Sequence, residues 1–166
     1  MLAHFKAVLL FVEGRNVEAE REIRKTLIAS PDHPNAHTSY GIIAFALGRK
    51  EEALAAFRRA FQVAQTPIVK ARLGWALGHA GKVEEARRIL GEMEEQAKRH
   101  EATPAQVAMV AGGLGELDLA FRLLDEAVKV HDPALLQARV APMFGELRKD
   151  PRFDRLLAQI GLDLKR

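Results

Sequence analysis

His33 and His37 stand four residues apart, a spacing at which two imidazoles on one helix face can bind a metal ion. Pro34 lies between them and favours the first turn of a helix. His33 is therefore expected to precede the helix, so that the two rings do not share a face. We predict that both histidines lie on the surface and that the chain binds no metal.

An acidic cluster at Glu92, Glu94 and Glu95 could supply the paired carboxylates of acid and base catalysis. Glu94 and Glu95, however, stand four residues before Lys98 and Arg99, and this spacing brings opposite charges together on an exposed helix face. We therefore interpret the cluster as an ion-paired, solvated surface.

The residue types needed for covalent catalysis or phosphate binding are missing or lack their context. The chain has no cysteine, which excludes thiolate nucleophiles, thiolate metal sites and disulfides, and no Ser/His/Asp constellation is legible. The segment AGGLG, residues 111–115, has neither the preceding strand nor the Lys-Ser or Lys-Thr pair of a phosphate loop. We predict a protein that is not an enzyme and needs no cofactor.

Composition and charge narrow the classes of partner. Of the 166 residues 48% are hydrophobic and 28% charged, which is typical of a soluble folded protein. The net charge is +3, and seven Lys or Arg against four Asp or Glu from residue 134 onward account for it, so no broad basic face is expected. The apolar run at residues 7–12 is too short to span a bilayer. We expect a cytoplasmic protein that binds neither nucleic acid nor membrane.

The elements that carry these residues repeat along the chain every 33 or 34 residues. Glycines set the spacing, an alanine follows each of them by five residues, and a small residue precedes each by seven. The three sets are Gly14, Gly48, Gly81 and Gly115; Ala19, Ala53, Ala86 and Ala120; and Ala7, Gly41, Gly74 and Ala108. Small residues let two crossing helices approach, and a glycine can end the first helix in a left-handed conformation, so each copy predicts an antiparallel helix pair.

The pattern predicts eight helices and no strand. Thr66, Thr103, Asp132 and Asp150 each precede a proline and are expected to cap a helix, with Gln106 completing a capping box for Thr103. The predicted helices span residues 2–13, 16–30, 34–47, 49–65, 67–80, 82–100, 104–114 and 117–131.

The best copy resembles the tetratricopeptide repeat (TPR) family. The residues that carry the resemblance are Tyr40-Gly41, Ala44, Gly48, Ala53, Phe57 and Ala60, with Pro31 where the family often ends a repeat. The resemblance implies an all-α fold, a right-handed α-solenoid of about four TPR-like helix pairs, at residues 1–33, 34–66, 67–100 and 101–131. It also implies a non-catalytic interaction module or scaffold.

Residues 132–166 are expected to form a short helical C-terminal cap. Pro142, Phe144 and Leu147 recur nine residues later as Pro151, Phe153 and Leu156. These two turns resemble the end of TPR tails in bacterial winged-helix regulators and serine/threonine kinases. Apolar residues of the segment would cover the last helix pair, as open arrays require: Phe144, Leu147, Phe153, Leu157 and Ile160. The resemblance implies an alternative function, a regulatory tail separated from its effector domain.

A groove on the concave face is the candidate binding site. Helical spacing places an apolar stripe on the first helix of each pair, opposite the face that meets its partner helix. The stripe comprises Val8, Phe11, Thr38, Ile42, Phe45, Ala71, Trp75, His79 and Met109. In the TPR family this face binds peptides, and the apolar stripe favours a hydrophobic segment or an amphipathic helix. Alternatively, Phe45, Trp75 and Met109 fill contacts between successive repeats.

Three further expectations concern partners. The family's clamp for acidic peptide tails needs Lys, Asn and Arg where this chain has His4, Val8, Ser39 and Ile68, with only Arg72 matching, so such tails are not expected to bind. The stripe lacks the polar base-reading side chains of a helical RNA reader. A homodimer, where one forms, is expected to use the N-terminal pair, whose outer face has no covering repeat.

Overall fold

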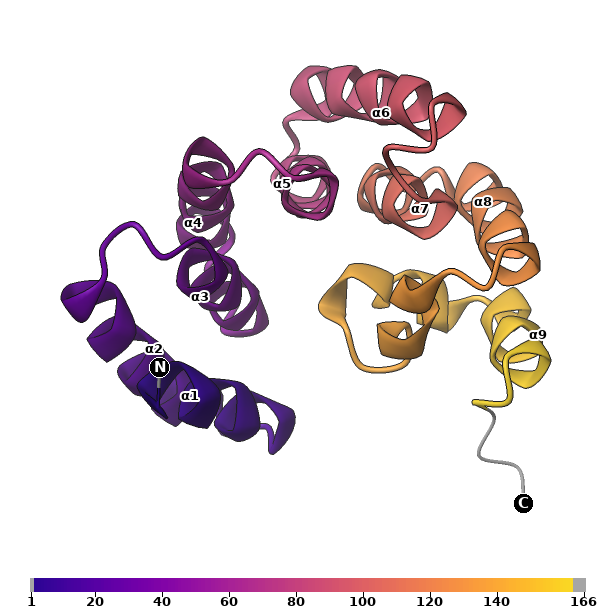
Figure 1. Ribbon diagram of the computed structural model, residues 1–166. Helices are drawn as coiled ribbons and strands as arrows, with labels where there is room; N and C mark the ends of the chain where they lie inside the picture. The colour runs from indigo at the N-terminus through magenta and orange to yellow at the C-terminus, as the bar shows by residue number, and fades with distance from the viewer. Residues whose placement is uncertain (1, 163–166) are drawn as a thin grey trace.

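The structure, a computed structural model, describes residues 2–162, and helices follow one another in it around an arc (Figure 1). Four pairs of α-helices make up the arc, and each helix begins and ends within two residues of its predicted bounds. The pairs are α1 (Leu2–Val12) with α2 (Asn16–Ala29), α3 (Pro34–Ala46) with α4 (Lys50–Val63), α5 (Pro67–His79) with α6 (Val83–Lys98), and α7 (Pro104–Gly113) with α8 (Leu117–Lys129). No strand occurs in the described part of the chain, and the predicted all-α repeat fold is confirmed.

The repeating glycines end the first helix of every pair in the predicted conformation. Gly14, Gly48, Gly81 and Gly115 have φ values of 77°, 78°, 72° and 77°, in the left-handed region that glycine adopts without strain. In each turn the N–H of the following residue donates to a carbonyl five residues before it, at 2.9 Å. This bond closes the helix and turns the chain back at the same angle in each pair.

The small residues seven positions before these glycines lie where paired helices cross. A Cβ atom built on Gly41 would lie 2.9 Å from the ring of Phe57, and one on Gly74 would lie 2.8 Å from Cγ2 of Ile89. Ala7 and Ala108, at the same position of the other pairs, are fully buried. Alanine at Gly41 or Gly74, and any side chain larger than alanine at Ala7 or Ala108, would therefore push the paired helices apart.

The predicted helix caps are confirmed at three of four positions. Thr103 forms the expected capping box with Gln106, and Asp150 accepts a hydrogen bond from the backbone N–H of Arg152. Asp132 accepts one from Ala134. The prediction for Thr66 was wrong, because its side chain makes no capping hydrogen bond although Pro67 begins α5.

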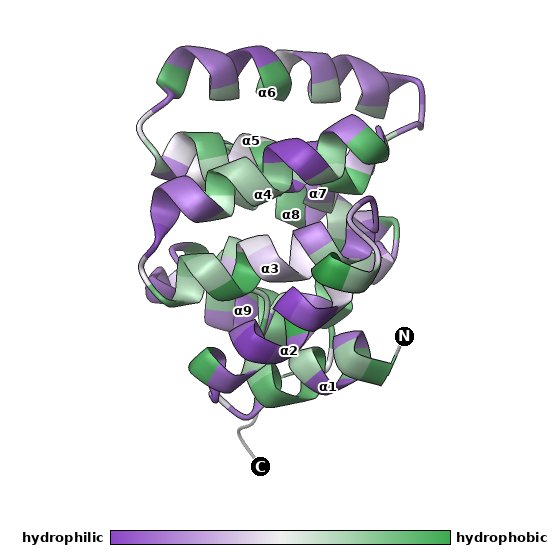
Figure 2. Ribbon diagram, turned by 90° about the vertical axis from the view of Figure 1, so that its left-hand side faces the viewer, coloured by the Kyte–Doolittle hydropathy of each residue, from purple (hydrophilic) through white to green (hydrophobic). Residues whose placement is uncertain are grey.

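The first and second helices of the pairs differ in burial. In α7 every residue from Val107 to Gly113 is buried, and α5 is buried from Leu73 to Leu77. Figure 2 shows α6 as mostly hydrophilic with isolated hydrophobic residues, and its buried residues are Ala86, Ile89, Leu90 and Met93. The first helices therefore form the inner layer of the arc. None of the helices between residues 2 and 162 has the length and apolar composition needed to cross a membrane.

The segment after α8 folds back onto the inner side of the arc (Figure 1). It consists of three short 3₁₀ turns, η1 (Pro133–Gln137), η2 (Pro142–Phe144) and η3 (Leu147–Lys149), and one helix, α9 (Pro151–Gln159). The expected capping helices are thus mostly 3₁₀ turns. Phe144, Leu147 and Phe153 are buried in the same core as α7 and α8. The last four residues of the expected cap, 163–166, lie outside the described part of the chain.

Candidate binding site on the concave face

A hollow of about 520 Å³ lies inside the arc, between the first helices and the C-terminal segment. We call it the concave hollow. Its walls come from α1, α3, α5 and α7 on one side and from residues 137–143 on the other. The lining residues are Val8, Phe11, Val12, Gly14, Asn16, Ser39, Ile42, Ile43, Ala46, Arg72, Met109, Gln137, Val140, Ala141, Pro142 and Met143. Its size and its mainly apolar lining are those of sites that hold a ligand in proteins.

Four of the predicted groove residues line this hollow. Val8 is 42% exposed, Phe11 and Ile42 are half-buried, and Met109 is buried at its base. They come from three different repeats, so the curvature of the array brings together residues about a hundred positions apart in sequence. The expected binding of a partner by these residues stays a prediction.

Three other predicted residues do not face the hollow. Thr38, Ala71 and Trp75 are buried between helices, and Trp75 is only 1% exposed. The expectation that they line an open groove is corrected, because α5 and α7 pack so closely that Gly113 contacts the backbone of Trp75. Trp75 instead fits the alternative interpretation, in which it fills contacts between successive repeats.

Phe45, Trp75 and His79 form a stack of rings that joins α3 to α5. The ring centroids of Phe45 and Trp75 lie 4.3 Å apart, and those of Trp75 and His79 lie 4.7 Å apart. Burial lowers the pKa of His79 below its ordinary value. Phe45 and His79 remain half-buried, so the open end of the stack belongs to the surface whereas Trp75 belongs to the core.

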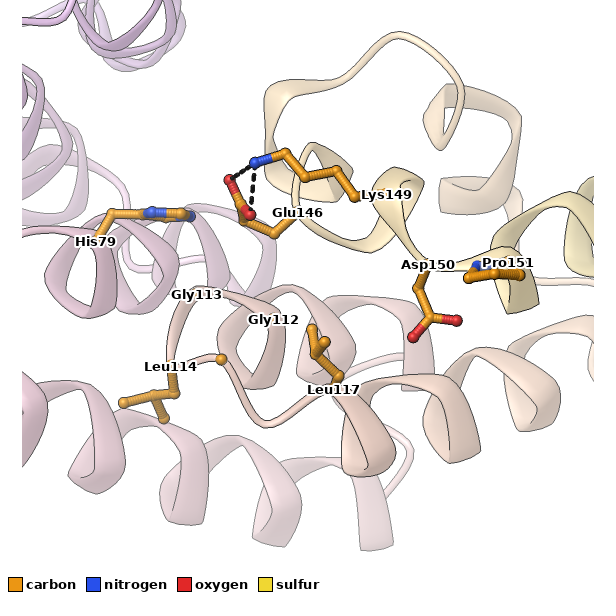
Figure 3. A pocket seen from close by; sticks show the side chains of 10 residues that line it. His79, Gly112, Gly113, Leu114, Leu117, Glu146, Lys149, Asp150 and Pro151 are labelled. Carbon is orange, nitrogen blue, oxygen red and sulfur yellow. Dashed lines mark hydrogen bonds and ion pairs between the residues drawn. The ribbon is translucent and has the colours of Figure 1, made fainter.

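A second hollow of about 530 Å³ opens at the rim where α5 and α7 end, and we call it the rim pocket (Figure 3). Figure 3 shows His79 directed toward Glu146, which lies on η3's side of the pocket. The carboxylate of Glu146 accepts hydrogen bonds from Lys149 at 2.9 and 2.8 Å, and these bonds lower its pKa. Because the carboxylate is already paired with a cation, it is poorly placed to act as a general base.

Arg72 is the charged residue in the wall of the concave hollow. Its Nε is buried and has no hydrogen-bond partner among residues 2–162, and burial lowers the pKa of its guanidinium. The neighbouring polar residue Ser39 bonds to Nε2 of His4 at 2.9 Å. The hollow therefore combines apolar walls with two buried polar atoms that lack a partner within the described residues, Nε of Arg72 and Oδ1 of Asn16.

The residues examined for metal and acid–base chemistry have structural roles. Nδ1 of His33 accepts a hydrogen bond from the backbone N–H of Ala36, and Nε2 of His37 lies 2.6 Å from the carbonyl oxygen of Pro31. Within the described residues, no three potential ligands of the His, Cys, Asp and Glu types gather at one point.

The acidic cluster of α6 is ion-paired as expected, although its partners differ. Glu92 pairs with Lys70 at 2.6 Å, and Glu95 pairs with Lys98 at 2.6 Å. Arg99 pairs with Glu101 rather than with Glu95, because the chain turns after α6 and brings Glu101 beside it.

An apolar stripe lies on the outer face of α1. Leu2, Phe5 and Leu9 are all exposed, with Phe5 at 72%. Their spacing of three and four residues places them along one face of the helix. The stripe is separate from the side of α1 on which Ala7 and Leu10 are buried.

Comparison with known families agrees with this geometry. Residues 6–67 match a family model described as "Tetratricopeptide repeat", and residues 67–92 match a second model with the same description. The chain belongs to the tetratricopeptide repeat family. The comparison with curated proteins found no match. Tetratricopeptide repeats generally act as protein–protein interaction modules and are typically non-catalytic.

The matched residues cover the TPR array from α1 into α6, whereas α7, α8 and the C-terminal segment lie beyond them. The resemblance of that segment to the tails of regulators and kinases stays a prediction. Residues 137–143 are the part of the hollow that sequence reasoning missed. The one hint in the sequence of this segment is Val140, an apolar residue that fits no helical stripe. In the structure its side chain is 65% exposed.

Proposed function

We propose that the chain is a non-catalytic scaffold that binds an apolar or amphipathic segment of a partner protein in the concave hollow. The observation that carries the proposal is the convergence of four helix pairs and residues 137–143 on one mainly apolar hollow. Apolar surface removed from water there would supply most of the binding free energy.

Selection from a displayed library of random peptides tests the proposal. We expect the selected peptides to be apolar or amphipathic. Val8→Lys or Val140→Lys places a charge at an exposed edge of the hollow and should weaken their binding by at least about tenfold, which corresponds to 1.4 kcal/mol. Fluorescence anisotropy measures the affinity.

Ile28→Lys is the matched control, because Ile28 is 81% exposed at the end of α2 and does not line the hollow. It should leave peptide affinity unchanged. Equal affinity of wild type, Val8→Lys and Val140→Lys would contradict the proposed site, and so would selection of uniformly polar peptides.

We also propose that the apolar stripe of α1 pairs with the same stripe of a second copy. A stripe spaced by three and four residues can mesh with its own copy about a two-fold axis. Sedimentation velocity should show a dimer for wild type and a monomer for Phe5→Asp, with Ile28→Asp still dimeric. Monomeric wild type would contradict the dimer and would favour the alternative, in which the array is a regulatory tail whose α1 packs on an effector domain.

A further inference from the structure

Arg72 differs from Arg148, which is also half-buried. Arg148 donates hydrogen bonds from Nη1 to the carbonyl oxygens of Ala138 and Ala141, at 3.0 and 2.8 Å. Arg72 has a buried Nε without a partner and forms no ion pair with any acidic side chain of residues 2–162. Hydrogen bonds within the fold therefore explain why an arginine stands at position 148, whereas none within the described part of the chain explains the arginine at position 72.

The guanidinium of Arg72 is half-buried, and its buried Nε–H, which has no acceptor among residues 2–162, destabilises the folded chain. Arginine keeps its charge in proteins, so the guanidinium cannot relieve the penalty by losing a proton. An apolar side chain of similar length would fill the same space without this cost. The position of Arg72 is consistent with a role in binding, in which a ligand supplies the missing acceptor.

The surroundings of Arg72 define the chemistry of such a ligand. No Asp or Glu lines the concave hollow, so Arg72 is the only charge in its described lining. Ile42, Met109 and Met143 provide apolar surface, and Ser39 and Gln137 provide uncharged groups that can donate hydrogen bonds. A group with one negative charge and an apolar body complements this arrangement.

Geometry favours a carboxylate and a small molecule. The planar guanidinium matches the two oxygens of a carboxylate better than it matches other anions of one charge. The hollow is closed on its far side by residues 137–143, and its volume of about 520 Å³ lies within the range of small-ligand sites.

We propose that the concave hollow binds a small amphipathic carboxylate, with its carboxylate on Arg72 and its apolar body against Ile42, Met109 and Met143. This goes beyond the proposed function, because the ligand is a small molecule. Since both would occupy one hollow, the carboxylate and a partner segment would exclude each other.

Methionine-methyl NMR of the full chain, titrated with hexanoate, octanoate, decanoate and phenylalkanoates, tests the proposal. Met109 and Met143 line the hollow, whereas Met93 is buried in α6 away from it and serves as an internal control. We expect saturable shifts of the Met109 and Met143 signals with at least one carboxylate, and no shift of Met93. The alcohol of the same chain length should bind about 10- to 100-fold more weakly, as expected for loss of charge-assisted hydrogen bonds.

Arg72→Met provides the second arm. It should weaken carboxylate binding about 10- to 100-fold, as much as replacing the carboxylate by the alcohol does, and it should leave the affinity for the alcohol unchanged. Its melting temperature should equal or exceed that of wild type, because it removes a buried N–H that has no acceptor in the described chain, whereas loss of a structural arginine would lower it. Arg72→Lys keeps the charge without the planar fork and should bind with intermediate affinity.

Three results would overturn the inference. They are the absence of Met109 and Met143 shifts with every carboxylate, equal affinity of Arg72→Met and wild type, and equal affinity for carboxylate and alcohol. If selected peptides with an acidic residue depend on Arg72 while no small carboxylate binds, the inference fails and the proposed function stands. If carboxylates bind as expected while no peptide binds at the hollow, the proposed function fails alone.

Discussion

The backbones of Gly78 in α5 and Gly113 in α7 touch, with no side chain between them. A Cβ atom built on Gly78 would fall on the carbonyl group of Gly113, and one on Gly113 would lie 2.7 Å from Cα of Trp75. This contact joins the third repeat to the fourth. It sets the curvature that carries Arg72 and Met109 to the same hollow.

Gly78→Ala should therefore destabilise the chain by about 1 to 3 kcal/mol, the range for overpacking a tight contact. The neighbour is backbone and cannot move aside as a flexible side chain could. Urea unfolding followed by circular dichroism measures the effect.

Gly91→Ala is the matched control, because Gly91 lies exposed in α6 with nothing within 4 Å of its built Cβ. There alanine should stabilise the chain by about 0.5 to 1 kcal/mol through its better helix propensity. Equal effects of the two substitutions would contradict the close approach of α5 and α7.

Trp75→Ala should cost about 3 to 5 kcal/mol, because it empties a buried site between Phe45 and Phe57. Trp75 is the only tryptophan, so wild-type fluorescence reports its surroundings directly. We expect blue-shifted emission that acrylamide quenches poorly. Red-shifted, readily quenched emission would instead place Trp75 at the surface.

Local rules predicted the repeat fold almost to the residue. Turn glycines such as Gly48 and crossing residues such as Gly41 act on their own helix pair, so their spacing encodes the pair completely. The concave stripe was less predictable, because Ile42 in α3 and Trp75 in α5 occupy equivalent positions of their repeats but differ in burial. The difference comes from Gly113, which lets α7 close over Trp75, and helical periodicity within one repeat does not describe contacts with the next.

The return of residues 137–143 into the arc also depends on distant contacts. Asp132 starts it, because its two carboxylate oxygens accept hydrogen bonds from the backbone N–H groups of Ala105 and Ala134, each at 3.0 Å. The sequence predicted a cap at Asp132, but only for the helix that follows. The hydrogen bond from Ala105, at the start of α7, joins Asp132 to a residue 27 positions earlier in the chain.

Asp132→Ala should therefore cost about 1 to 3 kcal/mol, because it leaves two backbone donors without their acceptor and the site is buried. Thr66→Ala tests the same sequence context, a capping residue before proline, where the side chain makes no hydrogen bond. We expect this control to change the unfolding free energy little. Thermal unfolding of both variants measures the two losses of stability. An equal loss of stability in the two variants would show that the hydrogen bonds of Asp132 do not stabilise the fold.

Acid should weaken the N-terminal cap of α9 at Asp150. Hydrogen bonds from the side chain and backbone of Arg152 lower the pKa of Asp150 from 3.8 to about 2. Because the folded chain holds the proton less tightly than the unfolded chain, Asp150 contributes stability above pH 3.8 that is lost as the pH falls toward 2. Asp150→Asn keeps an oxygen that can cap α9 but does not titrate.

The melting temperature of wild type should therefore exceed that of Asp150→Asn at pH 6, and the difference should shrink as the pH falls from 3.8 to about 2. The comparison with Asp150→Asn cancels the titration of the other carboxylates, so a difference that does not change with pH would mean that the Asp150–Arg152 pair does not form in solution.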